Sequence, residues 1–447
     1  DKFWLVGLIN VQKETILKKM EQYNARYILF QFTGADGNLK GVEMSKRAFV
    51  KAKQIGVDGS SIGFLRTKQS DMIISPDPDT VIPVPWAENT IAVFCDLRST
   101  DTNDRISADP RGILIETLNR LENEFNAYYY ARPEMEFYIL TRDLRPIDKA
   151  GYMSLPPIDK GYYLRKLIID MLNEVNLPYK TFHHEVGPSQ HEIEFQSLPA
   201  LKAADGVQLF KQLAKITALY QTEDWLVTFM PKPFIREAGN GLHIHQSIFT
   251  ENGSNLFEGS KGGKELTEFC IHFIAGQLRY AKEIAAITNP IINSYRRLTP
   301  GIEAPVYLTW GVANRTALIR VPGYEAGRLE YRAADAATNI YFSLALLLEA
   351  GLEGVRNKLE PPPEITFDPD QYSVKELKEK GVELLPRTLK EALENFRKSK
   401  LVEKVLGAPL QQHYYEARMN EWKDFTSEYS FEKKEITSFE IRHYLDC

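Results

Sequence analysis

Cysteine is scarce in this 447-residue sequence, which contains only Cys95, Cys270 and Cys447. Three thiols at such wide spacing form neither a disulfide framework nor a zinc knuckle, and they are typical of a reducing compartment. The chain also lacks an apolar run of about 18 residues that could cross a bilayer. Its first residues, DKFWLVGLIN, have neither the basic segment nor the long apolar core of a signal peptide. We therefore expect a cytoplasmic protein with no membrane partner.

Charge of one sign is not in large excess, because the formal net charge is −5. A broad basic surface for nucleic acid would need a clear surplus of Lys and Arg, so no nucleic-acid partner is expected. The sequence also has no GxxxxGK[ST] loop, which excludes a P-loop nucleotide site. Any nucleotide would therefore have to be held by metal ions and arginines.

Two domains of unequal size are predicted. At about 150 residues per domain, the length allows two or three. A helical pattern over 14–24 precedes strand-like segments over 25–34, 39–45 and 90–99. The polar run TDTNDR that follows, at 100–105, is typical of a linker. We place a small N-terminal domain at 1–102 and a larger domain at 103–447.

The larger domain is predicted to mix helices with short, charged strands. Helical patterns occupy 112–125, 162–175, 206–220 and 340–359. On a strand, residues i and i+2 point to the same face. Four segments follow this rule and align, in chain order, Glu134 with Glu136, Glu192 with Glu194, His243 with His245, and Arg328 with Glu330 and Arg332.

Such repeated pairs indicate a bound cation. One pair alone is ordinary on a half-exposed strand, but like charges side by side destabilise a sheet, and a cation removes the repulsion. The segment HHEVGPSQHEIEF, residues 183–195, adds to the pattern with three glutamates and three histidines. Carboxylates with an occasional imidazole are the ligands that Mg²⁺ or Mn²⁺ prefers, whereas zinc favours more histidine or cysteine. Two such ions would suit chemistry on phosphates.

A cluster of arginines follows further along the chain. Each one alone could be a surface or salt-bridge residue, but their grouping between a TPG turn and apolar strands favours a shared anion site. The planar guanidinium suits a two-pronged grip on carboxylate or phosphate. The cluster consists of Arg296, Arg297, Arg315, Arg320, Arg328 and Arg332.

Taken together and in this order, the motifs resemble those of a class I glutamine synthetase of the shorter bacterial and archaeal type. The resemblance runs from Tyr27 to Tyr444. It implies an α+β fold, in which a small β-grasp-like domain precedes a catalytic domain with a curved antiparallel sheet flanked by helices. The segments that carry it are DGSSIGF with SDM and PDP (58–78), DPR at Asp109, PEMEF, DKAGY (148–152), HHEVGPSQHEIEF, FMPKP (229–233), NSYRRLTPGIEAP (293–305), NRTALIRVP (314–322) and RLEYR.

The resemblance also implies a role for each matching residue. One Mg²⁺ or Mn²⁺ ion would be held by Glu136, Glu185 and Glu192, and a second by Glu134, His243 and Glu330. ATP would contact His245, Ser247 and Arg328, and its transferred phosphate Arg315 and Arg320. L-Glutamate and ammonium would contact Tyr152, Glu185, Gly239, Arg297 and Arg332, with Asp58 accepting the ammonium proton and Glu303 closing over the intermediate.

In such a family, the γ-carboxylate of L-glutamate takes the γ-phosphate of ATP, and ammonia then displaces phosphate from the γ-glutamyl phosphate. Each active site lies between neighbouring subunits of a homo-oligomer, usually a dodecamer of two stacked hexamers. Arg66 matches a region tied to feedback by glutamine in some relatives, but a plain surface arginine is an equally good reading.

The chain departs from the family pattern at its substrate periphery. Ala238 stands where an asparagine usually helps to hold the glutamate backbone, RAADAATN lacks a usual proline, the segment after Pro322 is short, and the C-terminal tail FEKKEITSFEIRHYLDC is long. A γ-glutamyl ligase for an organic amine such as methylamine, ethanolamine or a polyamine therefore remains an alternative. A non-catalytic nitrogen sensor would be expected to lack metal ligands, and none is missing here.

Overall fold

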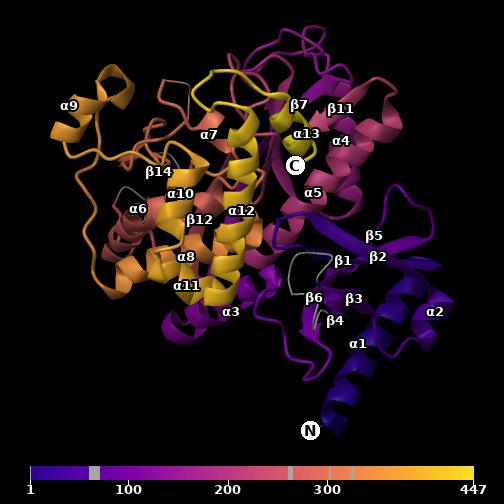
Figure 1. The fold of residues 1–447 in the computed structure, drawn as a ribbon. Helices are drawn as coiled ribbons and strands as arrows, with labels where there is room; N and C mark the ends of the chain where they lie inside the picture. Colours follow the sequence, from indigo (N-terminus) through magenta and orange to yellow (C-terminus); the bar gives the residue numbers. More distant parts are fainter. Residues whose placement is uncertain (1, 60–70, 260–264, 302–303, 324–326) are drawn as a thin grey trace. The chain divides into compact units, whose positions relative to one another are not determined.

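The computed structural model describes residues 2–59, 71–259, 265–301, 304–323 and 327–447. The chain forms two compact units, one of residues 1–113 with 168–177 and one of residues 114–167 with 178–447. Figure 1 shows the helices and strands of both. Among the described residues, no helix combines the length and the apolar character needed to cross a lipid bilayer.

The first unit is built on a mixed sheet with the strand order β2-β1-β6-β4-β3, and β5 pairs with β6. Strands β1 and β6 run parallel, and the other pairs are antiparallel. A turn at ADGN, residues 35–38, joins β1 to β2, and Gly37 in it takes a positive φ of 84°. Its elements are α1 (Lys2–Gln22), β1 (Tyr27–Thr33), β2 (Leu39–Ser45), α2 (Lys46–Lys51), β3 (Gly56–Asp58), β4 (Asp71–Pro76), β5 (Ile82–Pro83) and β6 (Thr90–Ser99).

The second unit contains a nine-stranded sheet whose main path is β13-β14-β15-β12-β7-β9-β8, with β10 and β11 also pairing with β7. Its pairs are antiparallel except β13 with β14. The strands are β7 (Ala127–Thr141), β8 (Tyr179–His184), β9 (Gln190–Phe195), β10 (Leu198–Pro199), β11 (Trp225–Thr228), β12 (Leu242–Thr250), β13 (Trp310–Val312), β14 (Ile319–Val321) and β15 (Leu329–Tyr331).

Helices account for most of the rest. Helix α8 is the core of the second unit, because nearly all of its side chains are buried, and α6 packs along it. Figure 1 shows α10, α11 and α12 beside these two helices. The helix bounds are α3 (Pro110–Phe125), α4 (Tyr162–Glu174), α5 (Ala200–Gln221), α6 (Glu268–Thr288), α7 (Ser294–Arg297), α8 (Ile340–Arg356), α9 (Val374–Glu379), α10 (Leu389–Phe396), α11 (Lys400–Leu406), α12 (Ala408–Glu428) and α13 (Ser438–Tyr444).

Candidate active site

One face of the large sheet carries the predicted carboxylates. Along β7, fully buried residues alternate with partly exposed ones, and Arg132, Glu134 and Glu136 all belong to the partly exposed set. The alternation follows from the two-residue period of a strand, so these three side chains share a face. The partly exposed face of β7 therefore carries three charged side chains.

Strand pairing brings the remaining charged residues to the same place. Antiparallel register sets Glu134 opposite His243 on β12 and opposite Glu194 on β9. The next pair along, Glu136 and Glu192, is also directly opposite. On the far side of β12, His245 faces Glu330 of β15. Side chains on such opposed positions are close enough to interact.

The trio predicted for one metal ion is assembled. The Nδ1 atom of His243 lies 3.3 Å from Oε2 of Glu134 and 3.6 Å from Oε1 of Glu330. His245 joins them, because its Nε2 is 2.5 Å from Oε1 of Glu134. Glu330 is completely buried and is balanced by two cations, Arg332 at 3.0 Å and Arg320.

The trio predicted for the other ion gathers around the turn between β8 and β9. Glu185 lies in that turn, where His183 Nε2 is 3.0 Å from its Oε1 and 3.9 Å from Oε1 of Glu192. Glu136 accepts a hydrogen bond of 2.6 Å from the backbone N–H of Gly241. His183, to which the resemblance gave no role, is thus within reach of the same two carboxylates.

Burial and mutual repulsion perturb the acidity of this cluster. Burial, together with the neighbouring carboxylates Glu134 and Glu136, raises the pKa of Glu192 well above its ordinary value. Burial likewise raises the pKa of Glu136, although His243 opposes the shift, and Glu185 adds to it. These two carboxyl groups therefore hold their negative charge only at a cost that a nearby cation would remove.

The pKa values on the histidine side move the other way. Burial opposes ionisation of Glu134, but His245 and His243 outweigh it and lower the pKa of this carboxyl. Burial also opposes ionisation of Glu330, and Arg332 with the two histidines lowers its pKa to about 2. One half of the cluster is thus already neutralised by the protein, and the other half is not.

The donor set fits hard divalent cations. Among the residues that the structure describes, three groups with ligand atoms close together occur on this face: Glu134, His245 and Glu330; Glu134, Glu192 and His243; and His183, Glu185 and Glu192. Carboxylate oxygens predominate, with imidazole as the minority ligand, which suits Mg²⁺ or Mn²⁺.

A cavity of about 930 Å³ opens above this face. The predicted substrate residues Tyr152, Gly239, Arg297, Arg315, Arg320 and Arg332 all line it. Gly239 has no room for a side chain, since a Cβ atom there would lie 2.7 Å from the carbonyl oxygen of Pro231 and 2.8 Å from Cγ of Arg297. Any larger residue would therefore displace Arg297.

Arg297 is held firmly in its place. Its Nη1 donates to the carbonyls of Ala333 (2.7 Å) and Ala334 (3.2 Å), and its Nη2 donates to that of Arg332 (3.2 Å). These bonds leave only part of its five donors for a substrate. By contrast, Arg315 is exposed in the loop between β13 and β14, and Tyr152 is 55% exposed with its ring edge-to-face against His183.

Other predicted residues lie outside this cavity's lining. Ser247 is buried two positions beyond His245 on β12, and Arg328 is buried just before β15. Asp58 is exposed at the end of β3 and belongs to the first compact unit. Glu303 and Arg66 lie outside the described residues.

The two remaining histidines of the 183–195 segment form a buried support behind the site. His184 lies between Asp148, 3.2 Å from its Nε2, and the backbone carbonyl of Glu185, 2.7 Å from its Nδ1. His191 Nδ1 is 2.5 Å from Nη1 of Arg165. Both imidazoles are completely buried, and His184 holds the backbone of Glu185 in place through the contact of its Nδ1 with that carbonyl.

Sequence reasoning missed Arg132. Its Nη2 is 2.5 Å from Oε1 of Glu194 and 4.0 Å from Oε1 of Glu134, so it is a fixed positive charge on the ligand face. The signal was available, because Arg132 stands two residues before Glu134 on the same strand. Thr181 donates a further hydrogen bond of 2.7 Å to Glu194.

Known families and proteins match nearly the whole length of this chain. The glutamine synthetase catalytic-domain family matches residues 107–444, and the glutamine synthetase beta-Grasp domain family matches residues 24–100. The glutamine synthetase of Thermotoga maritima is 37% identical, with 97% of this chain and 99% of that protein aligned. The glutamine synthetase of Thermococcus kodakarensis is 38% identical over 95% and 97% of the two chains.

Solved structures are similar as well. A GmaS/ADP complex superposes with a TM-score of 0.84 at 27% sequence identity, covering 96% of this chain and 99% of the other. Apo GmaS without ligand superposes with a TM-score of 0.82 at the same identity, covering 96% and 98%.

Proposed function

The chain belongs to the glutamine synthetase family, and we propose that the sheet face described above ligates ammonia to the γ-carboxylate of L-glutamate at the expense of ATP. The products are glutamine, ADP, phosphate and a proton. The observation that carries the proposal is the grouping of four glutamates and three histidines, with four arginines around the neighbouring cavity.

Two divalent ions would be held by Glu136, Glu185 and Glu192 and by Glu134, His243 and Glu330. When bound, Mg²⁺ or Mn²⁺ neutralises charge that spreads over the phosphoryl oxygens during transfer. The raised pKa values of Glu136 and Glu192 support this assignment, because a cation is what relieves their repulsion.

The arginines would orient the two anionic substrates. Arg297 and Arg332 would bind the carboxylates of L-glutamate, and Arg315 and Arg320 the phosphate that moves from ATP to the γ-carboxylate. A carboxylate is a poor electrophile, and conversion to an acyl phosphate gives it a good leaving group. His245, Ser247 and Arg328 would contact the nucleotide, and fixed cations around the transferred group lower the barrier by electrostatic stabilisation.

Ammonium must lose a proton before it can attack, because it has no lone pair. We assign this proton to Asp58, with Glu303, Glu185 and Tyr152 completing an anionic and polar ammonium site. Closure of the segment with Glu303 would exclude water, which would otherwise hydrolyse the acyl phosphate. Asp58 would come from a neighbouring subunit of a dodecamer made of two stacked hexamers.

We also propose a domain boundary after Thr102 and a cytoplasmic location. The boundary is supported by the gap between the two family matches, which end at residue 100 and begin again at residue 107. The location is supported by the use of ATP and by three cysteines that are all free thiols.

Phosphate release from ATP with Mg²⁺ and L-glutamate tests the reaction. Ammonium should be strongly preferred over methylamine, ethanolamine and a polyamine. Preference for one of these amines would keep the acyl-phosphate mechanism and replace ammonium by the organic amine as the substrate. No phosphate release with any amine would contradict the proposed function.

The variant Asp58→Ala separates the ammonium site from the metal site. We expect it to bind Mn²⁺ as the wild type does and to need a much higher ammonium concentration. Unchanged ammonium kinetics in this variant would show that the proton acceptor lies elsewhere.

A further inference from the structure

The second compact unit has another large cavity, of about 940 Å³, which the reaction above does not use. It is lined by the end of α7 and the residues after it, by residues around α10, and by the segment before α13. Ile235, Leu298, Val306 and Leu385 contribute apolar walls. The cavity is thus able to cover a carbon skeleton as well as polar groups.

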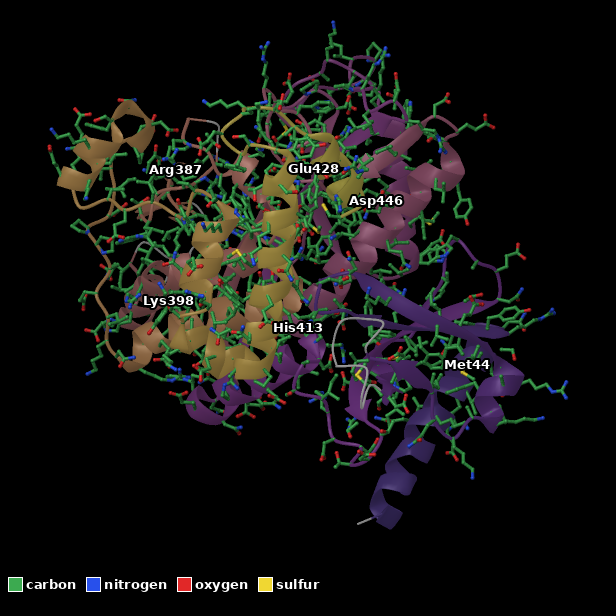
Figure 2. The ribbon with its side chains drawn as sticks, viewed as in Figure 1. Met44, Arg387, Lys398, His413, Glu428 and Asp446 are labelled. Carbon is green, nitrogen blue, oxygen red and sulfur yellow. The ribbon has the colours of Figure 1, made fainter. Side chains whose placement is uncertain are left out.

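Positive charge predominates in this lining, which has six basic and three acidic side chains. Two of the three carboxylates are already engaged: Glu391 accepts from the backbone N–H of Arg387, and Glu394 pairs with Arg397. Within the described part of the chain, the basic residues without an ion pair here are Arg387, Lys390, Lys398 and Lys434, all exposed. Figure 2 labels Arg387 and Lys398, which precede and follow α10.

Of the other two basic residues, Lys282 pairs with Glu383, and Arg296 is buried in the wall with only 4% of its surface exposed. Its Nη1 donates to the carbonyls of Phe431 (2.5 Å) and Lys433 (2.8 Å), and its Nε donates to Glu440 at 3.3 Å. The guanidinium also lies over the ring of Phe431, 4.2 Å from its centroid. Its Nη2 is buried without a hydrogen-bond partner, which is costly for a charged group unless a ligand or water satisfies it.

Arg296 therefore fastens the long C-terminal tail to α7. Phe431, Glu432 and Lys434 of this tail line the cavity, and Arg296 binds the backbone carbonyls of Phe431 and Lys433. The neighbouring Arg297 points into the other cavity, above the charged sheet face. One short helix thus contributes a side chain to each of the two cavities.

We propose that this second cavity binds a small polyvalent anion, a carboxylate or phosphate compound with a short apolar portion. Arg387, Lys390, Lys398 and Lys434 attract and hold its acidic groups, and the apolar walls cover its carbon atoms. The bound anion contacts the residues that follow Arg297, namely Leu298, Thr299 and Pro300. The proposed anion site thus lies directly after Arg297, which lines the other cavity.

Calorimetric titration of the full-length protein, without substrates or divalent cations, tests the site. The probes are citrate and succinate for carboxylates and pyrophosphate for phosphates. The triple variant Lys390→Gln, Lys398→Gln, Lys434→Gln removes three exposed charges from the rim. The control variant Lys375→Gln, Lys378→Gln, Lys400→Gln removes three exposed charges elsewhere in the same unit and has the same net charge.

We expect at least one probe to bind the wild type and the control alike, and to bind the rim variant about tenfold more weakly. Whether citrate and succinate or pyrophosphate shows this difference identifies the acidic group. Equal binding to both triple variants, or no binding of any probe to the wild type, would overturn the proposal. Because no turnover is measured, these outcomes are independent of which amine the active site uses.

Discussion

His243 is the imidazole in the proposed ligand set, which is otherwise carboxylate, and it lies between Glu134 on β7 and Glu330 on β15. We expect His243→Ala to weaken binding of one divalent ion and to lower turnover by roughly a hundredfold or more. The reason is that the imidazole that would bind the ion between Glu134 and Glu330 is then missing. Manganese binding measured by electron paramagnetic resonance, with parallel phosphate-release assays, provides the test.

The exposed His413 of α12, labelled in Figure 2, offers a matched control, since it is not among the residues that line either cavity. His413→Ala should bind manganese and turn over as the wild type does. Wild-type rates in His243→Ala would contradict the assignment of this ligand.

Arg132 and Glu194 form an ion pair beside the proposed metal ligands. Arg132 on β7 is also directly opposite His245 on the neighbouring strand β12. Arg132→Gln removes a cation from this face, so we expect weaker binding of ATP, with KM raised about three- to tenfold, and slightly tighter binding of metal. Glu194→Gln should shift both quantities in the opposite direction. The measurements are ATP kinetics and metal titrations.

The double variant decides whether the two side chains act as a pair. If they do, Arg132→Gln with Glu194→Gln should lie close to the wild type and give a coupling energy of about 1 kcal/mol. Strictly additive effects would mean that each side chain acts on the site by itself.

Helices α6 and α8 approach each other through two glycines. A Cβ atom on Gly276 would lie 2.1 Å from the carbonyl oxygen of Ala350, and one on Gly354 would lie 2.0 Å from that of His272. Backbone atoms of a buried helix cannot move aside cheaply, so these glycines set the distance between the helices.

Gly276→Ala should therefore destabilise the protein even though alanine favours helix. We expect a loss of about 1–3 kcal/mol, typical of overpacking, seen as a lower Tm in thermal denaturation. Gly56→Ala is the control, because its Cβ would meet only the carbonyl oxygen of Met72 at 3.8 Å. A Tm for Gly276→Ala at or above the wild-type value would show that the two helices separate without cost.

Shared active sites would be a property of the assembled molecule, with Asp58 and the metal ligands supplied by different subunits. Asp58→Ala and Glu330→Ala are each expected to be nearly inactive at low ammonium. After dissociation and reassembly of an equal mixture, about a quarter of the sites should combine an intact Asp58 with an intact ligand set. Recovery of about a quarter of the wild-type activity would be measured by phosphate release.

Unmixed variants taken through the same dissociation and reassembly provide the baseline. Activity that stays at this baseline after mixing would place Asp58 and the metal ligands in the same subunit.

Local pattern was sufficient for much of the fold and for part of the site. The strand period of two correctly predicted that Glu134 and Glu136 share a face of one strand. The helical pattern over 340–359 correctly predicted a helix, α8, that begins at Ile340. The first strands were equally readable, since β2 and β6 have the predicted bounds. These features depend on neighbours in the sequence, which is why a single chain is enough to predict them.

Long-range pairing does not follow from local pattern, and the order of the strands in the sheet sets it. Glu134 meets His243, Glu194 and Glu330 because β7 lies between β12 and β9, and β15 lies beyond β12, an order that does not follow the chain. The pairing of Arg132 with Glu194 depends on that order and could not be predicted.

The same holds for the two arginines of α7. Consecutive helical residues point about 100° apart. Arg296 and Arg297 therefore diverge once α7 has formed, and the packing of the C-terminal tail against α7 decides that Arg296 lines a second cavity while Arg297 lines the one above the charged sheet face. The sequence thus determined which residue types share a strand face, and the packing of distant segments determined which charges meet.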